Sequence, residues 1–157
     1  MIYAGTGHRP DKLGGYKDDA RLELEKFAER VLRTLEVPAT QIISGGAQGW
    51  DQALAFAALR LEIPFTLAMP FESQASAWPY EVQMRHRALK KAAARVVVVQ
   101  PGGFAAWKMQ ARNVWMVNEA QAVLALWNGT SGGTANCVAY AKASGVPVMN
   151  LWERWGK

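Results

Sequence analysis

Short apolar or β-branched segments alternate along the chain with longer amphipathic segments. The short segments predict strands near residues 1–4, 41–44, 65–68, 95–99, 122–127 and 146–150. The longer segments predict helices over residues 18–35, 50–61, 79 onward, 111–120 and 134–144. Because strands that alternate with helices form parallel sheets, the chain is expected to adopt an α/β fold, a Rossmann-like open parallel sheet of five to six strands with helices on both faces.

Two segments carry this interpretation best. Residues 18–35 place Leu22, Phe27, Val31 and Leu35 at helical spacing among charged positions, which predicts a helix packed on the sheet. Residues 95–99 contain four consecutive valines and are therefore apolar on both faces. Since helices cover both faces of a parallel sheet, this run predicts a central strand.

The composition favours one domain over residues 1–157. Half of the 157 residues are hydrophobic, enough for a sizeable core, and no linker or repeat divides the chain. Cys137 has no second cysteine to pair with, and no Cys/His cluster has zinc-ligand spacing, so we expect a cytoplasmic location, no metal site and a buried structural role for Cys137. The sequence contains no apolar run long enough to cross a membrane.

The formal net charge of +5 is spread along the chain and forms no single basic block. This distribution is compatible with a small phosphorylated ligand and with nucleic acid, although a continuous basic groove is not indicated. Trp127, Trp152 and Trp155 near the C-terminus are interpreted as core or subunit-interface residues, and a homo-oligomer is expected.

Three glycine-rich segments carry the candidate chemistry: residues 5–10 (GTGHRP), 44–49 (SGGAQG) and 129–134 (GTSGGT). Each follows a predicted strand, so all three should meet at the carboxyl edge of the sheet, where α/β proteins bind ligands. Glycine allows close backbone approach, and free amides at a helix N-terminus bind phosphate oxygens. None of the segments has the lysine of a P-loop or the GxGxxG dinucleotide spacing, which argues against ordinary nucleotide hydrolysis and nicotinamide redox chemistry.

These landmarks, in this order, resemble the SLOG superfamily, which includes the YpsA-like proteins, the lonely-guy cytokinin-activating enzymes and the DNA-processing protein A family. The resemblance is closest to the small YpsA-like branch. It implies a Rossmann-like sheet that holds a nucleotide-type ligand, in a group whose members sense nucleotide-derived signals, cleave nucleoside monophosphates or engage single-stranded DNA. It depends on Gly5-Thr6-Gly7-His8-Arg9-Pro10, residues 44–51 (SGGAQGWD), Pro70-Phe71 with Gln74 and Trp78-Pro79, Arg112-Asn113 with Met116-Val117, and Gly132-Gly133-Thr134-Ala135-Asn136.

The candidate ligand-binding residues come from these landmarks, and no catalytic residue is assigned. Arg9 can contact phosphate and His8 can donate to an oxyanion or stack on a base, the alternative being an exposed turn. Asp51 fits a ribose contact or a helix-dipole role equally. The full set is Gly5, Thr6, Gly7, His8, Arg9, Ser44, Gly45, Gly46, Gln48, Asp51, Gln74, Trp78, Arg112, Asn113, Gly132, Gly133, Thr134 and Asn136.

The remaining candidates have equally plain structural alternatives. Arg112 and Asn113 are expected to start a helix as a ligand clamp or as a surface pair. Gln74 and Trp78 are expected as a lid or as buried packing. Thr134 and Asn136 can bind ligand or cap the helix that follows Gly133.

Three functions follow from this site. The leading one is a sensor or sequestering module that binds a nucleotide or nucleotide-derived ligand, such as an ADP-ribose-like or cyclic nucleotide, with no other cofactor expected. The second is N-glycosidic hydrolysis of nucleoside monophosphates, which needs a carboxylate at the pocket. The lonely-guy pattern PGGxGTxxE supplies one, but Ala135, Asn136 and Cys137 follow Gly133-Thr134 here, which leaves Glu72, Glu81 or Glu119. The third is single-stranded nucleic-acid binding.

Overall fold

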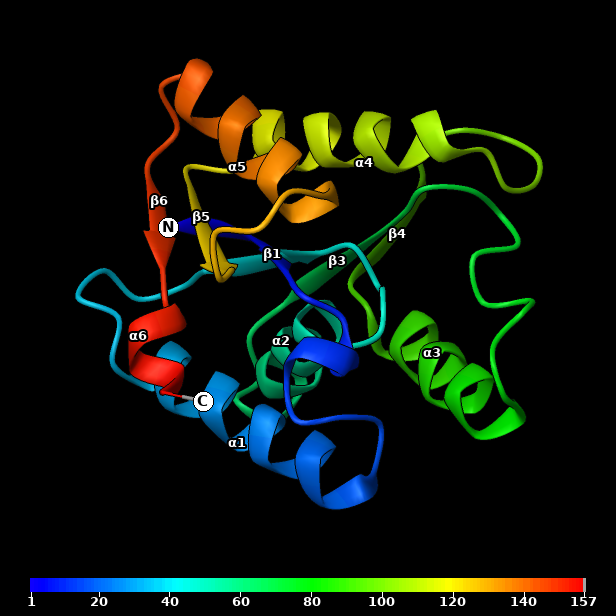
Figure 1. Cartoon of the computed structure of the whole chain (residues 1–157), viewed down its shortest axis with the longest axis horizontal. Helices are drawn as coiled ribbons and strands as arrows, with labels where there is room; N and C mark the ends of the chain where they lie inside the picture. Colours follow the sequence, from blue (N-terminus) through cyan, green and yellow to red (C-terminus); the bar gives the residue numbers. More distant parts are fainter. Residues whose placement is uncertain (157) are drawn as a thin grey trace.

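The computed structural model describes residues 1–156, and it contains one six-stranded, all-parallel sheet (Figure 1). The strands are β1 (Ile2–Gly7), β2 (Gln41–Ser44), β3 (Phe65–Met69), β4 (Arg95–Val98), β5 (Ala122–Leu126) and β6 (Val148–Asn150). The helices are the 3₁₀ turn η1 (Pro10–Lys12), α1 (Asp18–Arg33), α2 (Trp50–Arg60), α3 (Tyr80–Ala92), α4 (Ala106–Glu119), α5 (Gly133–Ala143) and α6 (Trp152–Trp155). The predicted Rossmann-like α/β class is confirmed.

The strand order β4-β3-β2-β1-β5-β6 creates a topological switch point. From β1 the chain steps outward through β2 and β3 to β4, and then returns across the sheet to β5, which pairs with β1 on its other side. The loops that leave β1 and β5 therefore diverge from neighbouring strands. In open α/β sheets ligands bind in the crevice at this point.

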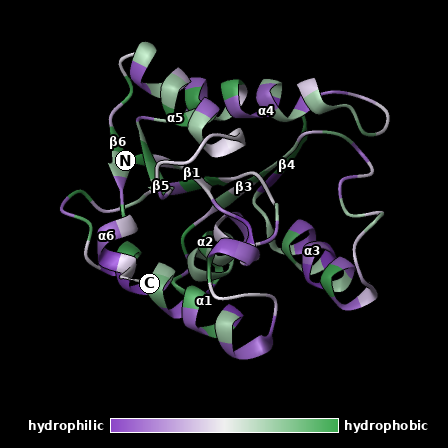
Figure 2. Cartoon of the chain, in the orientation of Figure 1, coloured by the Kyte–Doolittle hydropathy of each residue, from purple (hydrophilic) through white to green (hydrophobic). Residues whose placement is uncertain are grey.

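Helices cover both faces of the sheet, as the sequence predicts. Helices α1, α2, α3 and α6 lie on one face, and α4 and α5 lie on the other (Figure 1). Each layer encloses its own cluster of buried hydrophobic side chains. The helices present apolar residues to the sheet and polar residues outward (Figure 2), and α1 is the clearest case, because Leu24, Phe27, Ala28 and Val31 recur on one side.

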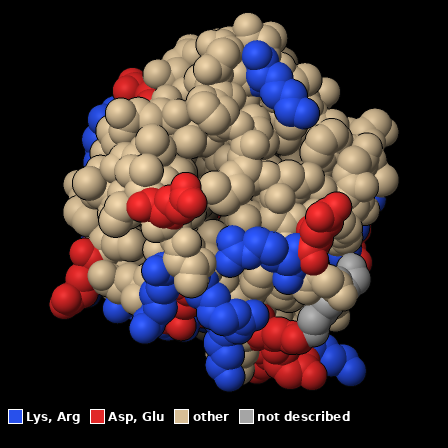
Figure 3. Space-filling model, turned by 90° about the vertical axis from the view of Figure 1, so that its left-hand side faces the viewer, with Lys and Arg blue, Asp and Glu red and all other residues tan. Residues whose placement is uncertain are grey.

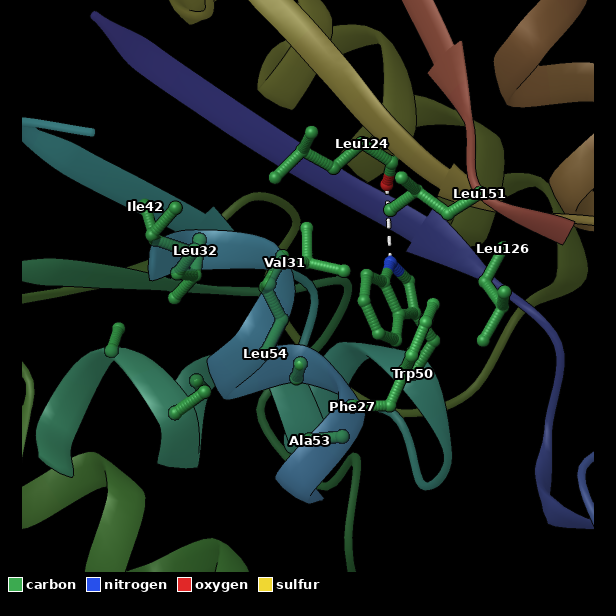
Figure 4. Packing of buried hydrophobic residues seen from close by; sticks show 14 of the residues in the cluster. Phe27, Val31, Leu32, Ile42, Trp50, Ala53, Leu54, Leu124, Leu126 and Leu151 are labelled. Carbon is green, nitrogen blue, oxygen red and sulfur yellow. Dashed lines mark hydrogen bonds between the residues drawn. The ribbon is translucent and has the colours of Figure 1, made fainter. Parts of the chain in front are cut away.

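Trp50 anchors the larger core at the start of α2. Its side chain is fully buried, and its indole Nε1 donates a hydrogen bond of 3.1 Å to the carbonyl oxygen of Leu124 in β5 (Figure 4). A Cβ atom at Gly7 would lie 2.6 Å from Trp50, and one at Gly5 would lie 2.6 Å from Leu54. Both β1 glycines thus make room for α2, a packing role in addition to any contact with a ligand.

The central position predicted for the valine run is wrong. Strand β4 is an edge strand, because the chain crosses to the far half of the sheet after it and no later strand pairs on its outer side. Val96 and Val98 are each 40% exposed as a result. Helix α4 also begins earlier than predicted, at Ala106, and neither η1 nor α6 was expected.

The C-terminal tryptophans contribute mainly to packing. Trp155 is buried against Phe27, and Trp152 contacts His8 edge-to-face at a ring-centroid distance of 5.6 Å. Trp127 donates from its indole to the carbonyl oxygen of Thr130 at 2.7 Å and so shapes the third glycine loop. The interpretation of Cys137 as a buried small residue is confirmed. Within residues 1–156, no helix combines the length and apolar character that a membrane crossing requires.

Candidate functional site

A cavity of about 270 Å³ lies at the switch point between the loops that follow β1 and β5. We call it the glycine-loop cavity. Helices α2 and α4 contribute the rest of its wall, through Asp51 and Arg112 among others. The candidate residues that it brings together are Gly5, Thr6, Gly7, His8, Arg9, Asp51, Arg112, Asn113, Gly132, Gly133 and Thr134.

The N-terminus of α5 forms one wall of this cavity. Gly132 precedes the helix with φ of 141°, a conformation that favours glycine, and no side chain caps the first turn. The capping alternative for Thr134 and Asn136 is therefore not realised. A Cβ atom at Gly133 would meet no atom within 4 Å, so the backbone amides at this helix start border open space. Such amides bind anionic oxygens.

Positive charge collects at the same place. Arg9 is exposed and makes no ion pair or hydrogen bond with its side chain among the described residues. Lys12, one turn along η1, donates to the hydroxyl of Thr130 at 3.4 Å and so joins the first and third glycine loops. The cavity thus presents free amides, hydroxyls and two surface cations, which is the donor set of a phosphate site.

His8 lies at the base of the first loop and is buried. Its Nε2 accepts a hydrogen bond of 2.9 Å from the backbone amide of Asn128, so the neutral ring carries its proton on Nδ1. Burial lowers the pKa of His8 below its usual range. The imidazole therefore joins the loops after β1 and β5 and remains neutral at physiological pH, with Nδ1 as its only free donor.

Asp51 and Arg112 are the two ionisable groups of the buried wall, and they influence each other electrostatically. Burial raises the pKa of the Asp51 carboxyl, an effect that the positive charges of Arg112 and Arg9 oppose. Asp51 also accepts a hydrogen bond from the backbone of Ala47. Burial in turn lowers the pKa of Arg112, while Asp51 opposes that shift. Each group thus shifts the pKa of the other toward the charged form.

The Arg112 side chain donates hydrogen bonds to the protein backbone in this structure. It lies two turns inside α4, whereas the sequence suggested a helix start, and it is 4% exposed. Its Nη1 donates to the carbonyl oxygens of Gly45 and Ala68, at the ends of β2 and β3, and its Nε donates to Asn113. A Cβ atom at Gly45 would lie 2.4 Å from Nη1, so this glycine is needed for the approach.

Seven candidate residues do not line the glycine-loop cavity: Ser44, Gly45, Gly46, Gln48, Gln74, Trp78 and Asn136. Ser44 is fully buried and donates to the carbonyl oxygen of Asp51. Gln74 is also buried, so it is packing and not an open lid, and its amide donates to the carbonyl oxygen of Gly45 at 2.9 Å. Most of the second glycine segment thus lies outside the cavity lining and packs against the residues that form its wall.

His86 of α3 contacts Gln74 and so belongs to the same buried group of polar side chains. Its Nε2 lies 3.0 Å from Oε1 of Gln74, and Trp78 packs edge-to-face on its ring. Because the Gln74 amide nitrogen donates to Gly45, Oε1 must accept, so neutral His86 carries its proton on Nε2. Burial, with a smaller contribution from Lys90, lowers the pKa of His86 from 6.5 to about 4.

This pKa predicts a pH-dependent stability. The folded state disfavours protonated His86, so its contribution is fully present above pH 6.5 and is lost as the pH falls toward 4. The full shift corresponds to about 3 kcal/mol in the free energy of unfolding. We expect urea unfolding at pH 7, 6, 5 and 4 to show this decline, and a His86→Gln variant to show a shallower one. His8 and the carboxylates titrate in both proteins, so equal slopes would contradict the assignment.

The cavity also contains residues outside the candidate set. Sequence reasoning missed Asp11, Lys12 and Met109, whereas Ala47, Thr130, Ser131 and Ala135 lie in the glycine-rich segments and landmarks that it singled out. Asp11 and Lys12 belong to the short turn η1, which begins at Pro10, and that proline was the signal that could have placed them. The three glutamates considered as a source of a catalytic carboxylate, Glu72, Glu81 and Glu119, are not among its lining residues. Its carboxylates are Asp11 and Asp51. Among residues 1–156, no group of three or more His, Cys, Asp or Glu side chains could hold a metal ion.

The sequence of the chain is similar to a known family and to a known protein. The model of the YspA SLOG family matches residues 3–145. An uncharacterized SPbeta prophage-derived protein, YoqJ of Bacillus subtilis strain 168, is 30% identical over 138 residues, which cover 74% of this chain and 81% of YoqJ.

Solved structures share the fold at low sequence identity. DNA processing protein A of Streptococcus pneumoniae superposes with a TM-score of 0.67 at 19% sequence identity. DNA processing protein A of Helicobacter pylori, described for its single-stranded DNA binding mode, superposes with a TM-score of 0.63 at 18% sequence identity. The protein TM1055 superposes with a TM-score of 0.56 at 18% sequence identity, and the superposition covers 71% of its chain. Each superposition covers 94% of this chain, but only 48% and 63% of the two DNA processing proteins, so the chain spans about half to three fifths of their length.

Proposed function

The chain belongs to the YspA SLOG family, and from this premise we propose that it binds a nucleotide or nucleotide-derived ligand in the glycine-loop cavity, as a sensor or sequestering module. The ligand's phosphate contacts the amides at the start of α5 and the guanidinium group of Arg9. Thr6 and Thr134 also line this cavity.

The observation that carries this proposal is the coincidence of an uncapped helix N-terminus with an unpaired arginine at the switch point. A helix N-terminus attracts anions, and Arg9 adds a full positive charge that nothing else in residues 1–156 neutralises by direct contact. The volume of about 270 Å³ is at the small end for a ligand site, so it suits one phosphorylated nucleoside unit.

The test is isothermal titration calorimetry with AMP, cyclic AMP, ADP-ribose and adenosine, followed by chromatography of the mixtures. We expect the phosphorylated ligands to bind at least roughly tenfold more tightly than adenosine, because one charge-assisted hydrogen bond contributes about 1.5–3 kcal/mol. Equal affinity for adenosine and AMP would contradict a phosphate site. Steady release of free adenine, lost in Asp51→Asn, would instead indicate N-glycosidic hydrolysis.

Single-stranded DNA is a further ligand to titrate in the same way, because a fold relative from Helicobacter pylori is described as binding it. On the face shown in Figure 3, Lys and Arg side chains are interspersed with Asp and Glu, and no continuous basic track runs across it. Strand binding would be marked by an oligothymidine affinity that exceeds the affinity for AMP and falls steeply with salt.

A further inference from the structure

A second, larger cavity lies on the α1–α3 face of the sheet. It has a volume of about 760 Å³ and is enclosed by the segment between η1 and α1, the start of α2 and the start of α3. In Figure 1 these are the loop that enters α1 and the N-terminal end of α3, which face each other at the lower right. Its volume is within the range of small-molecule sites. We call it the tyrosine cavity.

Aromatic and apolar groups dominate its lining. Leu13, Leu24 and Ala53 are buried residues of its floor. Tyr16 and Tyr80 line it from opposite segments, yet they are 64% and 72% exposed. Two large aromatic rings held at the surface beside an apolar floor provide stacking surfaces for a flat ring, and bases stack on such side chains regardless of their identity.

The charges beneath the cavity are already matched. Glu25 is 1% exposed and pairs with Arg21, Arg60 and Arg85 at 3.2, 2.7 and 2.6 Å. Asp18 pairs with Arg21, and Glu29 lies 4.0 Å from Arg60, so three acids balance three arginines. This cluster therefore leaves no cation free for a second phosphate. Glu81, which also lines the cavity, has no ion pair among residues 1–156 and would repel one, so the cavity suits an uncharged aromatic group better.

One carboxamide side chain remains available in the lining. Gln48 lines the cavity at the end nearest the glycine loops, and its amide makes no hydrogen bond to residues 1–156. Neighbouring Gln52, in contrast, is committed to the carbonyl oxygen of Gly46 at 3.1 Å. A free carboxamide carries one acceptor and two donors, the complement of a nucleobase edge.

The two cavities share a wall. Arg9 and Asp11 line the glycine-loop cavity, whereas Pro10 between them lines the tyrosine cavity. The second segment of the wall divides in the same way, with Ala47 on one side and Gln48 on the other. The segments touch, because the amide of Trp50 donates to the carbonyl oxygen of His8 at 3.2 Å. Exposed Arg9 thus lies at the rim between both spaces.

We propose that the tyrosine cavity takes the base of a second nucleoside unit, joined through phosphate to the unit in the glycine-loop cavity. This inference rests on the proposed function and narrows it to a dinucleotide-type ligand. The linking phosphate passes over the shared wall at Arg9, and the second base stacks on Tyr16 and Tyr80 beside the amide of Gln48.

The experiment compares AMP with diadenosine diphosphate, linked 5′ to 5′, and with pApA, linked 3′ to 5′, by calorimetry. We expect at least one of the two dinucleotides to bind about tenfold or more tightly than AMP, as one stacked base contributes on that scale. Tighter binding of the 5′-to-5′ compound would indicate a free dinucleotide as the ligand, and tighter binding of pApA would indicate a segment of a nucleic-acid strand. Tyr16→Ala and Tyr80→Ala should each lower dinucleotide affinity about threefold to tenfold and change AMP affinity less than about twofold.

Phe104→Ala is the matched control, because Phe104 is a 75% exposed aromatic residue that lines neither cavity. It should leave all affinities unchanged. If AMP binds but neither dinucleotide binds more tightly, or if both tyrosine variants retain the full advantage, the inference is wrong and the proposed function stands. If AMP and both dinucleotides fail to bind, both are wrong.

Discussion

Replacing Gly133 by leucine should lower the affinity for a phosphorylated nucleotide by about 100-fold or more and leave the fold intact. Gly133 lines the glycine-loop cavity at the start of α5, and its backbone conformation accepts an L-residue. A leucine side chain there occupies the space in front of the amides. Loss of two charge-assisted hydrogen bonds, each contributing about 1.5–3 kcal/mol, gives this magnitude.

Ala139→Leu provides the control, since Ala139 is an exposed residue of the same helix and lies outside the cavity lining. Both variants should unfold thermally within a few degrees of the parent protein. Calorimetry with AMP distinguishes them. Normal binding by Gly133→Leu would place the phosphate elsewhere and remove the main support for the site, whereas equal loss in both variants would point to an effect on α5 as a whole.

The fold was largely predictable, because the alternation of short apolar and longer amphipathic segments depends on local sequence. The position of a strand within the sheet, in contrast, does not depend on local sequence. Residues 95–99 are apolar enough for a central strand, yet the edge place of β4 follows from the crossover to β5, a non-local event. The apolar character of the valines does not distinguish an edge strand from a central one, and Val96 and Val98 are each 40% exposed.

The candidate site was predictable at the level of loops and less so at the level of side chains. Gly7 and Gly45 were selected for approach to a ligand, but a Cβ atom on either would collide with Trp50 or Arg112 of the protein itself. Gln74 was selected by its place in a motif, and in the fold it holds the carbonyl oxygen of Gly45. Close packing and ligand approach both require the same residue types, so sequence alone does not separate them.

The tyrosine cavity was not predictable as a site, although Gln48, one of its lining residues, belongs to the candidate set. Its rim comes from Tyr16, Gln48 and Tyr80, which lie in three separate segments and follow no shared spacing. The expected helix start at Arg112 is wrong for a related reason of register, because α4 starts six residues before that arginine and carries it into the interior. Its role as a ligand clamp stays a prediction. Nucleotide binding, the homo-oligomer and the cytoplasmic location stay predictions.

Arg112→Met should destabilise the protein by about 3 kcal/mol even without any ligand. The substitution keeps an apolar side chain of similar length but removes the donors to the carbonyl oxygens of Gly45 and Ala68. It also removes the positive charge that opposes the rise of the pKa of the buried Asp51 carboxyl. Removing one partner of a buried charge pair costs about 3–5 kcal/mol, and we take the lower end because Arg112 and Asp51 form no direct ion pair.

The double variant Arg112→Met/Asp51→Asn separates these two causes. If the stranded carboxylate dominates, neutralising it should recover about half of the lost stability in urea unfolding at pH 7, and the two single changes will not add. If the lost carbonyl contacts dominate, the double variant stays as unstable as Arg112→Met. Arg33→Met on the exposed side of α1 is the control and should change stability by less than about 0.5 kcal/mol. An Arg112→Met protein as stable as this control would show that Arg112 is free to bind a ligand, and the phosphate site would then contain two arginines instead of Arg9 alone.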